Sequence, residues 1–291
     1  MFEYKNDVSR LETILTVLKL PLRKFLYILS KKYLDSNKPQ LAVYAFDYIG
    51  TTIAIDGFYE IRELELIEKW LKDRHPDVLK GTCLDIGANI GNHSVYFSNF
   101  FHKVRSFEPN PQAFKLLKIN TEFLDNVKVF NFGLSEKNRA AKFFTSKHNI
   151  GGSSLTSGCE NSLEIHVDLF SLNKLDFNNE NITFIKIDVE GHEMSVLEGG
   201  SNIFRDQSPI VAFEQHKHEF INGESAVINK LKDYGYNNFY CIKSTPHYIK
   251  PWMPLKNIIR LTHQIILGAS KIVVLQENFQ PDFYPLILAV K

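Results

Sequence analysis

The sequence predicts an α/β fold built on a doubly wound, mostly parallel sheet of seven strands. From residue 82 onward, short apolar runs alternate with stretches of helical periodicity, which is typical of a parallel sheet covered by helices. A further apolar run, YPLILAVK, ends the chain and supplies the seventh strand. With 291 residues, 44% of them hydrophobic, the chain is long enough to bury a substantial core in one or two domains.

The elements follow from these runs. Besides the terminal strand, strands are expected at 82–86, 104–107, 127–132, 182–187, 210–214 and 238–242. Helices are expected at 92–101, 111–124, 193–204 and 225–234. In such a sheet, ligands bind beyond the carboxyl ends of the strands. The loops expected to converge there are 85–93, 108–110, 133–136, 188–193 and 214–218.

Two segments lie outside this alternation. Residues 1–56 are predicted to form a helical, basic amphipathic extension in front of a main domain at 57–291. Within it, residues 10–33 place apolar side chains on one helical face, with a kink expected at Pro21. The segment 244–283 is inserted before the last strand, and its isoleucines, paired at intervals of seven residues, predict another amphipathic helix.

These segments leave three kinds of partner open. A basic amphipathic helix can dock on an anionic membrane, pack against a second subunit, or cover the core of its own domain. We therefore expect a peripheral membrane contact through 10–33 and 244–283, or a homodimer, or neither. The net charge of +1 argues against a nucleic-acid partner. Scattered cysteines and the lack of a secretory leader pattern favour the cytoplasm, with a peripheral place at the inner face of the membrane as an extension of this expectation.

The stretch TCLDIGANIGNHSVYF, residues 82–97, indicates a ligand site. Asp85 ends a strand, and Gly87 and Gly91 stand in the turn that leads into a helix, where a ligand can approach the backbone closely. Their spacing differs from the dinucleotide pattern GxGxxG. A carboxylate here would repel a pyrophosphate and attract a cation, and S-adenosylmethionine carries an ammonium and a sulfonium group.

A second acid supports the same cofactor. Glu108 ends the next strand, where a carboxylate can accept hydrogen bonds from both hydroxyls of a ribose. Asn89, Gly91 and Asn92 are expected to donate hydrogen bonds to the carboxylate of the methionine moiety. His93 is either a further contact of that carboxylate or a polar residue in the first helical turn.

Five segments together resemble the successive motifs of the FkbM family of S-adenosylmethionine-dependent methyltransferases. They are LDIGANIGNHS, SFEPNP, NFGLSEK, GGSSL and IKIDVEGHEMSVLEGG, and the resemblance covers about residues 57–218. It implies a Rossmann-like class I methyltransferase fold and methylation of hydroxyl oxygens on sugars, glycolipids or natural products. It also implies cofactor contacts at Pro109 and Asn110, and adenine contacts at Leu134 and Ser135.

Four residues are candidates for catalysis at the carboxyl edge of the sheet. Asp188 and Glu190 follow the fourth strand, and Glu214 and His216 follow the fifth. Methyl transfer to a hydroxyl requires positioning and benefits from a base, and a carboxylate can hold a histidine in the tautomer that a base needs. Asp188 is also expected beside the cofactor. As alternatives, the acids cap the helix that begins near Glu193, or Glu214 and His216 bond only to loop backbone.

Other functions remain open on the sequence alone. Asp188, Glu214, His216 and His218 could bind a divalent metal, but alternating E-x-H-x-H provides few ligands on one face, and no metal is predicted. The main prediction is an O-methyltransferase acting on a small-molecule, sugar or glycolipid acceptor. The alternatives are an N-methyltransferase of a small amine or peptide, and a non-catalytic cofactor-binding scaffold in glycan assembly.

Overall fold

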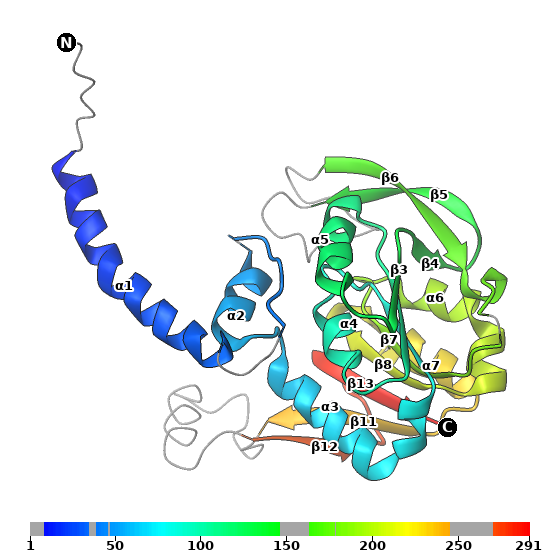
Figure 1. The fold of residues 1–291 in the computed structure, drawn as a ribbon. Helices are drawn as coiled ribbons and strands as arrows, with labels where there is room; N and C mark the ends of the chain where they lie inside the picture. Colours follow the sequence, from blue (N-terminus) through cyan, green and yellow to red (C-terminus); the bar gives the residue numbers. More distant parts are fainter. Residues whose placement is uncertain (1–8, 35–38, 46, 146–162, 178, 245–269) are drawn as a thin grey trace. The chain divides into compact units, whose positions relative to one another are not determined.

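The computed structural model describes residues 9–34, 39–45, 47–145, 163–177, 179–244 and 270–291. Two compact units make up the chain, Met1–Tyr59 and Glu60–Lys291. The first holds helices α1 (Arg10–Leu34) and α2 (Tyr48–Asp56) (Figure 1). The predicted division into 1–56 and 57–291 as functional domains stays a prediction.

Helix α1 confirms the helix expected at 10–33, and its start is locally encoded. The Ser9 N–H donates to a Glu12 carboxylate oxygen at 2.8 Å, and the Glu12 N–H donates to the Ser9 hydroxyl at 3.2 Å. This reciprocal pair is a capping box, which satisfies backbone donors that a helix start leaves unpaired. Pro21 lies inside α1 and does not end it.

The second unit is built on an eight-stranded sheet of order β12-β11-β13-β8-β7-β1-β2-β3. Strands β1, β2, β3, β7 and β8 pair in parallel, whereas β13, β11 and β12 run antiparallel to their neighbours. Strand order reverses between β1 and β7, which is where a doubly wound sheet binds its ligand. The predicted fold class is confirmed. The strands are β1 (Thr82–Ile86), β2 (Lys103–Phe107), β3 (Val127–Phe130), β7 (Ile182–Ile187), β8 (Ile210–Gln215), β11 (Asn238–Ser244), β12 (Lys271–Leu275) and β13 (Tyr284–Val290).

The principal helices of this unit are α3 (Ile61–Arg74), α4 (Asn92–Phe97), α5 (Pro111–Thr121), α6 (Glu193–Gly199) and α7 (Ala226–Asp233). Helix α4 is shorter than the predicted 92–101. The Asn99 side-chain amide donates to the carbonyls of Val95 and Tyr96 at 3.1 and 3.0 Å. It thereby satisfies the acceptors that a further helical turn would use, and the helix stops.

The prediction of seven strands is wrong by one, because β12 lies in the inserted segment that was expected to be helical. Ile272 and Val273 belong to this strand, and Val273 pairs with Ile242 of β11. Short runs of β-branched residues such as IVV favour a strand, and here pairing with β11 overrides the helical spacing. The other isoleucine pairs of the segment lie within 245–269, outside the described residues.

A second, three-stranded sheet was not predicted. It has the order β4-β6-β5, with β4 (Gly133–Ser135), β5 (Arg139–Thr145) and β6 (Leu163–Ser171), and Figure 1 shows β5 and β6 as long strands outside the main sheet. The alternation of polar and apolar residues in LEIHVDLFS was the available signal. The inward residues form a small core of Ala141, Phe143, Val167 and Leu169.

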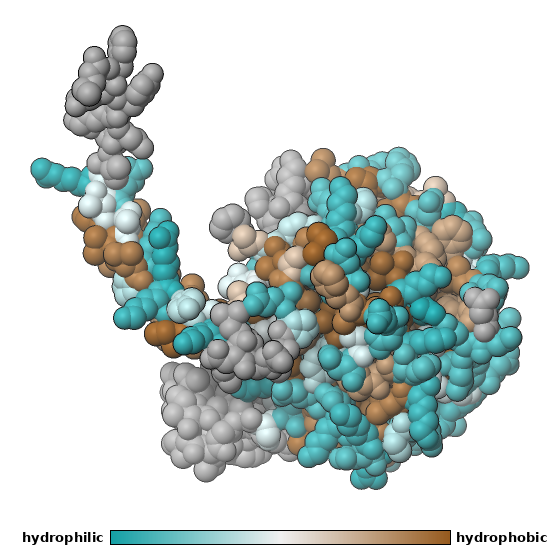
Figure 2. All heavy atoms as spheres, viewed as in Figure 1, coloured by the Kyte–Doolittle hydropathy of each residue, from teal (hydrophilic) through white to brown (hydrophobic). Residues whose placement is uncertain are grey.

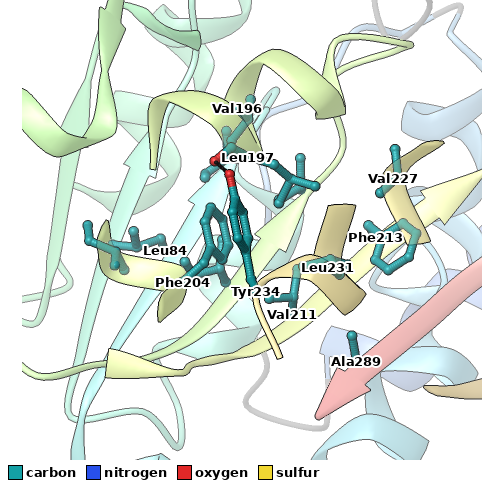
Figure 3. Close-up of a cluster of buried hydrophobic side chains, with 14 of the residues drawn as sticks. Leu84, Val196, Leu197, Phe204, Val211, Phe213, Val227, Leu231, Tyr234 and Ala289 are labelled. Carbon is teal, nitrogen blue, oxygen red and sulfur yellow. Dashed lines mark hydrogen bonds between the residues drawn. The ribbon is translucent and has the colours of Figure 1, made fainter. Parts of the chain in front are cut away.

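The main core lies between the sheet and helices α6 and α7 (Figure 3). Leu84 of β1 and Val211 and Phe213 of β8 are fully buried in it. The Tyr234 hydroxyl donates to the Leu197 carbonyl at 3.1 Å, so the polar atom of this aromatic ring is satisfied within the core. Rigid packing of β1, β7 and β8 fixes the starting points of the loops that follow them.

Candidate active site

The loop between β1 and α4 has a backbone that requires glycine. Gly87 and Gly91 have φ angles of 80° and 91°, and Asn89 has a φ of 50°. The N–H groups of Gly87 and Ala88 both donate to the Phe107 carbonyl at the end of β2, at 3.0 Å. A Cβ on Gly87 would lie 1.8 Å from the Asp188 carbonyl oxygen. The loops after β1 and β7 therefore touch at Gly87, which admits no side chain.

Glu108 joins the loops after β1 and β2. Its side chain is buried, and one carboxylate oxygen accepts the Asn89 N–H while the other accepts the Asn110 N–H, both at 2.7 Å. Each oxygen keeps a second lone pair for a ligand. Burial raises the pKa of Glu108 to about 7, against the lowering by the two N–H groups, and the carboxylates of Asp85 and Asp188 add to the rise.

Asp85 lies beneath the ligand loop and does not open onto the crevice as expected. It pairs in register with Ser106 on β2 and Lys186 on β7, and it is 0% exposed. One carboxylate oxygen accepts the Ser94 hydroxyl of α4 at 2.6 Å, and Ser94 in turn accepts the Ser106 hydroxyl at 2.8 Å. The reason is strand alternation, which turns Asp85 toward the face that α4 covers. Its contact with the cofactor stays a prediction.

Lys186 is a buried cation that the sequence analysis missed. Its Nζ donates to an Asp188 carboxylate oxygen at 3.1 Å and lies 3.6 Å from Oδ1 of Asp85. Burial alone would lower the pKa of Lys186, but the two aspartates outweigh it and raise this pKa above its ordinary value. Lys186 therefore stays charged and bridges the ends of β1 and β7. A lone lysine inside the apolar strand ITFIKI was the signal for it.

Three buried polar atoms around these loops lack a hydrogen-bond partner among the described residues, and two of them, on Asn89 and Asn110, indicate a polar ligand. Within the described part of the chain, Oδ1 of Asp85, Oδ1 of Asn89 and Nδ2 of Asn110 are buried and have no hydrogen-bond partner. Such atoms are costly unless a partner arrives. Oδ1 of Asp85 lies 3.6 Å from the Lys186 ammonium, which leaves the Asn89 acceptor and the Asn110 donor for a ligand that carries both donor and acceptor groups.

The four predicted catalytic residues come together at the ends of β7 and β8. Nε2 of His216 lies 3.6 Å from Oε1 of Glu214, and Asp188 keeps 36% of its side chain exposed. Burial, followed by the nearby carboxylates of Asp188 and Glu190, raises the pKa of Glu214 to about 8. Burial, followed by Asp188, raises the pKa of Glu190 to about 7. The three acids therefore share one electrostatic environment.

Asp188 remains the most acidic member of this group. Burial would raise its pKa, but Lys186 and then His93 outweigh it, so the pKa of Asp188 falls below its ordinary value. His93 itself faces Glu60, with Nε2 3.5 Å from a Glu60 carboxylate oxygen. The site thus combines one ionised aspartate with glutamates that titrate near neutral pH, an arrangement suited to moving a proton.

Asp188 does not cap helix α6, whose start has no side-chain cap from the residues that the structure describes, and the loop before the helix is held by Glu193. Oε1 of Glu193 accepts the N–H groups of Val189 and Gly191 at 3.4 and 3.2 Å. Glu193 is buried, which raises its pKa to about 7. Glu193 holds the backbone of this loop. The Asp188 carboxylate therefore pairs with Lys186 and keeps part of its surface toward the crevice.

The other residues predicted to bind the cofactor are buried or half-buried. Leu134 and Ser135 are buried in β4, and the Ser135 hydroxyl already bonds to the Glu136 carboxylate and lies 3.0 Å from Nε2 of His192. His192 is thereby turned toward β4. Adenine contact at Leu134 and Ser135 stays a prediction. Asn92 and Asn110 are buried and Pro109 is half-buried, whereas the GGSSL motif lies outside the described residues.

No metal-binding cluster is present among the residues described. Within those ranges, no group of three or more histidine, cysteine, aspartate or glutamate side chains is arranged to hold an ion. His218 stacks beside His216, with ring centroids 5.2 Å apart, and His216 lies 5.3 Å from the ring of Phe283. The rings of His216, His218 and Phe283 therefore form one aromatic cluster.

The stability of the protein should depend on pH through these glutamates. Because the folded-state pKa values of Glu190, Glu193 and Glu214 are raised above the ordinary 4.5, the folded chain holds protons that the unfolded chain has released. This contribution is fully present below pH 4.5 and is lost as the pH rises through 7 to 8. We expect the thermal unfolding midpoint to fall over that range.

Glu214→Gln should flatten this decline, because the amide does not titrate. Glu164→Gln, at an exposed position on β6, is the control and should leave the slope unchanged. Differential scanning calorimetry at several pH values measures both. A midpoint that rises between pH 6 and 8.5 (roughly the window of these pKa values) would contradict the assigned shifts.

The fold and the site together define a class of protein. A doubly wound sheet with a glycine turn after β1 and acidic loops after β7 and β8 is the arrangement of a Rossmann-like enzyme. Residues 85–237 match the family described as Methyltransferase FkbM domain. The chain belongs to this FkbM family and is a methyltransferase with the class I Rossmann-like fold.

Individual relatives are more distant. The hexuronic acid methyltransferase AglP of Haloferax volcanii is 28% identical over 168 residues, which cover 55% of this chain and 67% of AglP. A methyltransferase FkbM structure from Methylobacillus flagellatus is 14% identical with a TM-score of 0.38, covering 91% of this chain and 60% of that chain. Precorrin-6y C5,15-methyltransferase from Geobacter metallireducens is 13% identical with a TM-score of 0.39, covering 74% and 86%.

Proposed function

We propose that this chain transfers a methyl group from S-adenosylmethionine to a hydroxyl oxygen of a sugar, in a glycan precursor or a glycolipid. Two buried polar atoms without hydrogen-bond partners in the described part of the structure, Oδ1 of Asn89 and Nδ2 of Asn110, carry this proposal, together with the acids that follow β7 and β8. Membership of the FkbM methyltransferase family supports it, and so does the likeness to a hexuronic acid methyltransferase.

The residues proposed to bind the cofactor are two acids and two asparagines. Glu108 would accept hydrogen bonds from ribose hydroxyls through its remaining lone pairs, while Asp85 would supply negative charge behind the glycine turn. Asn89 and Asn110 would bond polar groups of the ligand through their unpaired atoms. When bound, S-adenosylmethionine supplies a methyl group that its sulfonium has already activated.

The acceptor side supplies position and proton transfer. Asp188 would orient the acceptor, since it is ionised and partly exposed. His216 would take the hydroxyl proton as the oxygen-to-carbon bond forms and the carbon-to-sulfur bond breaks, and Glu214 would face the resulting imidazolium. Such a base contributes about 10²–10⁴-fold, and holding acceptor and methyl in line can contribute roughly 7–11 kcal/mol.

Substituting Asp188 tests this assignment. The wild-type protein, given S-adenosylmethionine labelled in its methyl group, should label glycans that bear neutral hexoses or hexuronic acids. Asp188→Asn should lower the rate of methyl transfer about 10²-fold, because the carboxylate charge is lost while the shape of the side chain is kept. Asp168→Asn, an exposed acid on β6, is the matched control and should retain full rate.

The position of the label decides the reaction. Mass spectrometry of the product should place it on a hydroxyl oxygen. Label on a nitrogen or a carboxylate, or equal rates in wild type and Asp188→Asn, would contradict the proposal. Calorimetry that detects no binding of S-adenosylmethionine would contradict the whole proposal.

A further inference from the structure

Helix α1 exposes apolar side chains along one face. Leu11, Leu18, Leu22 and Phe25 are 67%, 63%, 56% and 57% exposed. Their spacing of three, four and seven residues places them on one side of the helix. Figure 2 shows hydrophobic residues (brown) gathered along α1 beside projecting hydrophilic ones (teal). Ile14, Leu15 and Leu26, on the same face, are also exposed, at 57%, 43% and 40%.

The opposite side of α1 carries basic residues interleaved with further exposed apolar ones, since Val17, Leu20, Tyr27 and Ile28 are 59%, 57%, 61% and 58% exposed. Lys19, Arg23, Lys24 and Lys31 are exposed there, and Arg10 lies at the amino end. Glu12 is the one acid of the helix, and its carboxylate is already held by the Ser9 N–H in the capping box. Six cations against one anion give residues 10–32 a surplus of five positive charges, with Lys32 counted from the sequence.

We propose that α1 docks on an anionic lipid surface, lying in the plane of the interface with its leucine face in the acyl boundary and its cations among the headgroups. Apolar burial and attraction to anionic headgroups add together in this geometry. A second copy of α1 would bury the same leucines but would bring another set of positive charges alongside the first. Charge complementarity therefore favours lipid over self-association.

The helix would lie on the membrane and not cross it. Of the helices that the structure describes, none is long and apolar enough to span a bilayer. Docking rests on the exposed and charged side chains of α1 alone, so it stands whichever acceptor the methyltransferase uses.

Vesicle binding of the full chain tests this surface. We expect the chain to sediment with vesicles of phosphatidylcholine and phosphatidylglycerol, to bind phosphatidylcholine alone much more weakly, and to be released by high salt, which screens the headgroup charge. Leu18→Glu/Leu22→Glu should weaken binding to mixed vesicles at least about tenfold, by placing charge in the apolar face. Lys19→Glu/Arg23→Glu should weaken it at least about tenfold by reversing two headgroup contacts.

Matched substitutions on the other unit serve as controls. Phe123→Glu/Ile221→Glu changes two residues that are 90% and 71% exposed, and it should leave binding unchanged. Circular dichroism checks that every variant keeps its helices. Equal binding to both kinds of vesicle, or no effect of either α1 variant, would overturn the proposal. So would a wild-type dimer in analytical ultracentrifugation that binds no vesicles and that Leu18→Glu/Leu22→Glu dissociates.

Discussion

Gly87→Ala should abolish methyl transfer and lower the free energy of unfolding by about 3 kcal/mol, from a strained positive φ and an overpacked contact together. The added Cβ would meet the Asp188 carbonyl oxygen at 1.8 Å, so the loops after β1 and β7 must separate. Separation moves Asp188 away from Lys186 and shifts the backbone that Asn89 offers to Glu108. Both halves of the site change at once.

Gly191→Ala is the matched control. Gly191 also has a positive φ, of 88°, but its Cβ would meet nothing within 4 Å. Strain at φ alone should then cost about 1 kcal/mol. Urea unfolding of both variants, with a methyl-transfer assay, separates strain from collision. Equal losses in the two variants would show that the contact between the loops is not what demands glycine at position 87.

Lys186→Met should lower the free energy of unfolding by about 3–5 kcal/mol, because it leaves the fully buried Asp85 without a countercharge. The same change should raise the pKa of Asp188, since Lys186 is the largest influence that lowers it. Activity near neutral pH should fall with the loss of the ionised aspartate. Urea unfolding and the pH profile of the transfer rate measure the two effects.

Two further variants isolate the buried pair. Asp85→Asn/Lys186→Met removes the fully buried carboxylate together with its countercharge, so it should be destabilised by less than the sum of the two single changes. Lys103→Met makes the same substitution on β2 at a lysine that is 39% exposed, and it should cost at most about 1 kcal/mol. Additive losses in the double variant would mean that Asp85 and Lys186 do not interact.

Local sequence was sufficient for the central strands and for the loops that leave them. Buried parallel strands are mostly apolar, so β1, β7 and β8 were recognisable within a residue or two of their ends. The glycines of the first turn follow from its backbone, and the edge at which the acids meet follows from sheet topology alone. Glu108, Asp188 and Glu214 were located in this way.

Features that depend on partners distant in sequence were not predictable in the same manner. The burial of Asp85 depends on its register with Lys186 and on the cover of α4, neither of which the DxGxxxG spacing encodes. The strand β12 depends on pairing with β11, which overrides a helical pattern. The role of Glu193 in holding the loop backbone could not be separated from the role of Asp188, because both acids stand beside the same helix start.

We propose that the carboxylate at the end of β2 holds the methyl donor, and titration calorimetry with S-adenosylmethionine measures this contact. Glu108→Gln keeps the shape of the side chain but replaces an acceptor that the ribose hydroxyls need, so affinity should fall at least about tenfold. Glu180→Gln is the control, since Glu180 is also a largely buried acid but pairs with Lys103 and Arg105 of β2. We expect a large loss of affinity for Glu108→Gln and wild-type affinity for Glu180→Gln. Unchanged affinity in Glu108→Gln would contradict it.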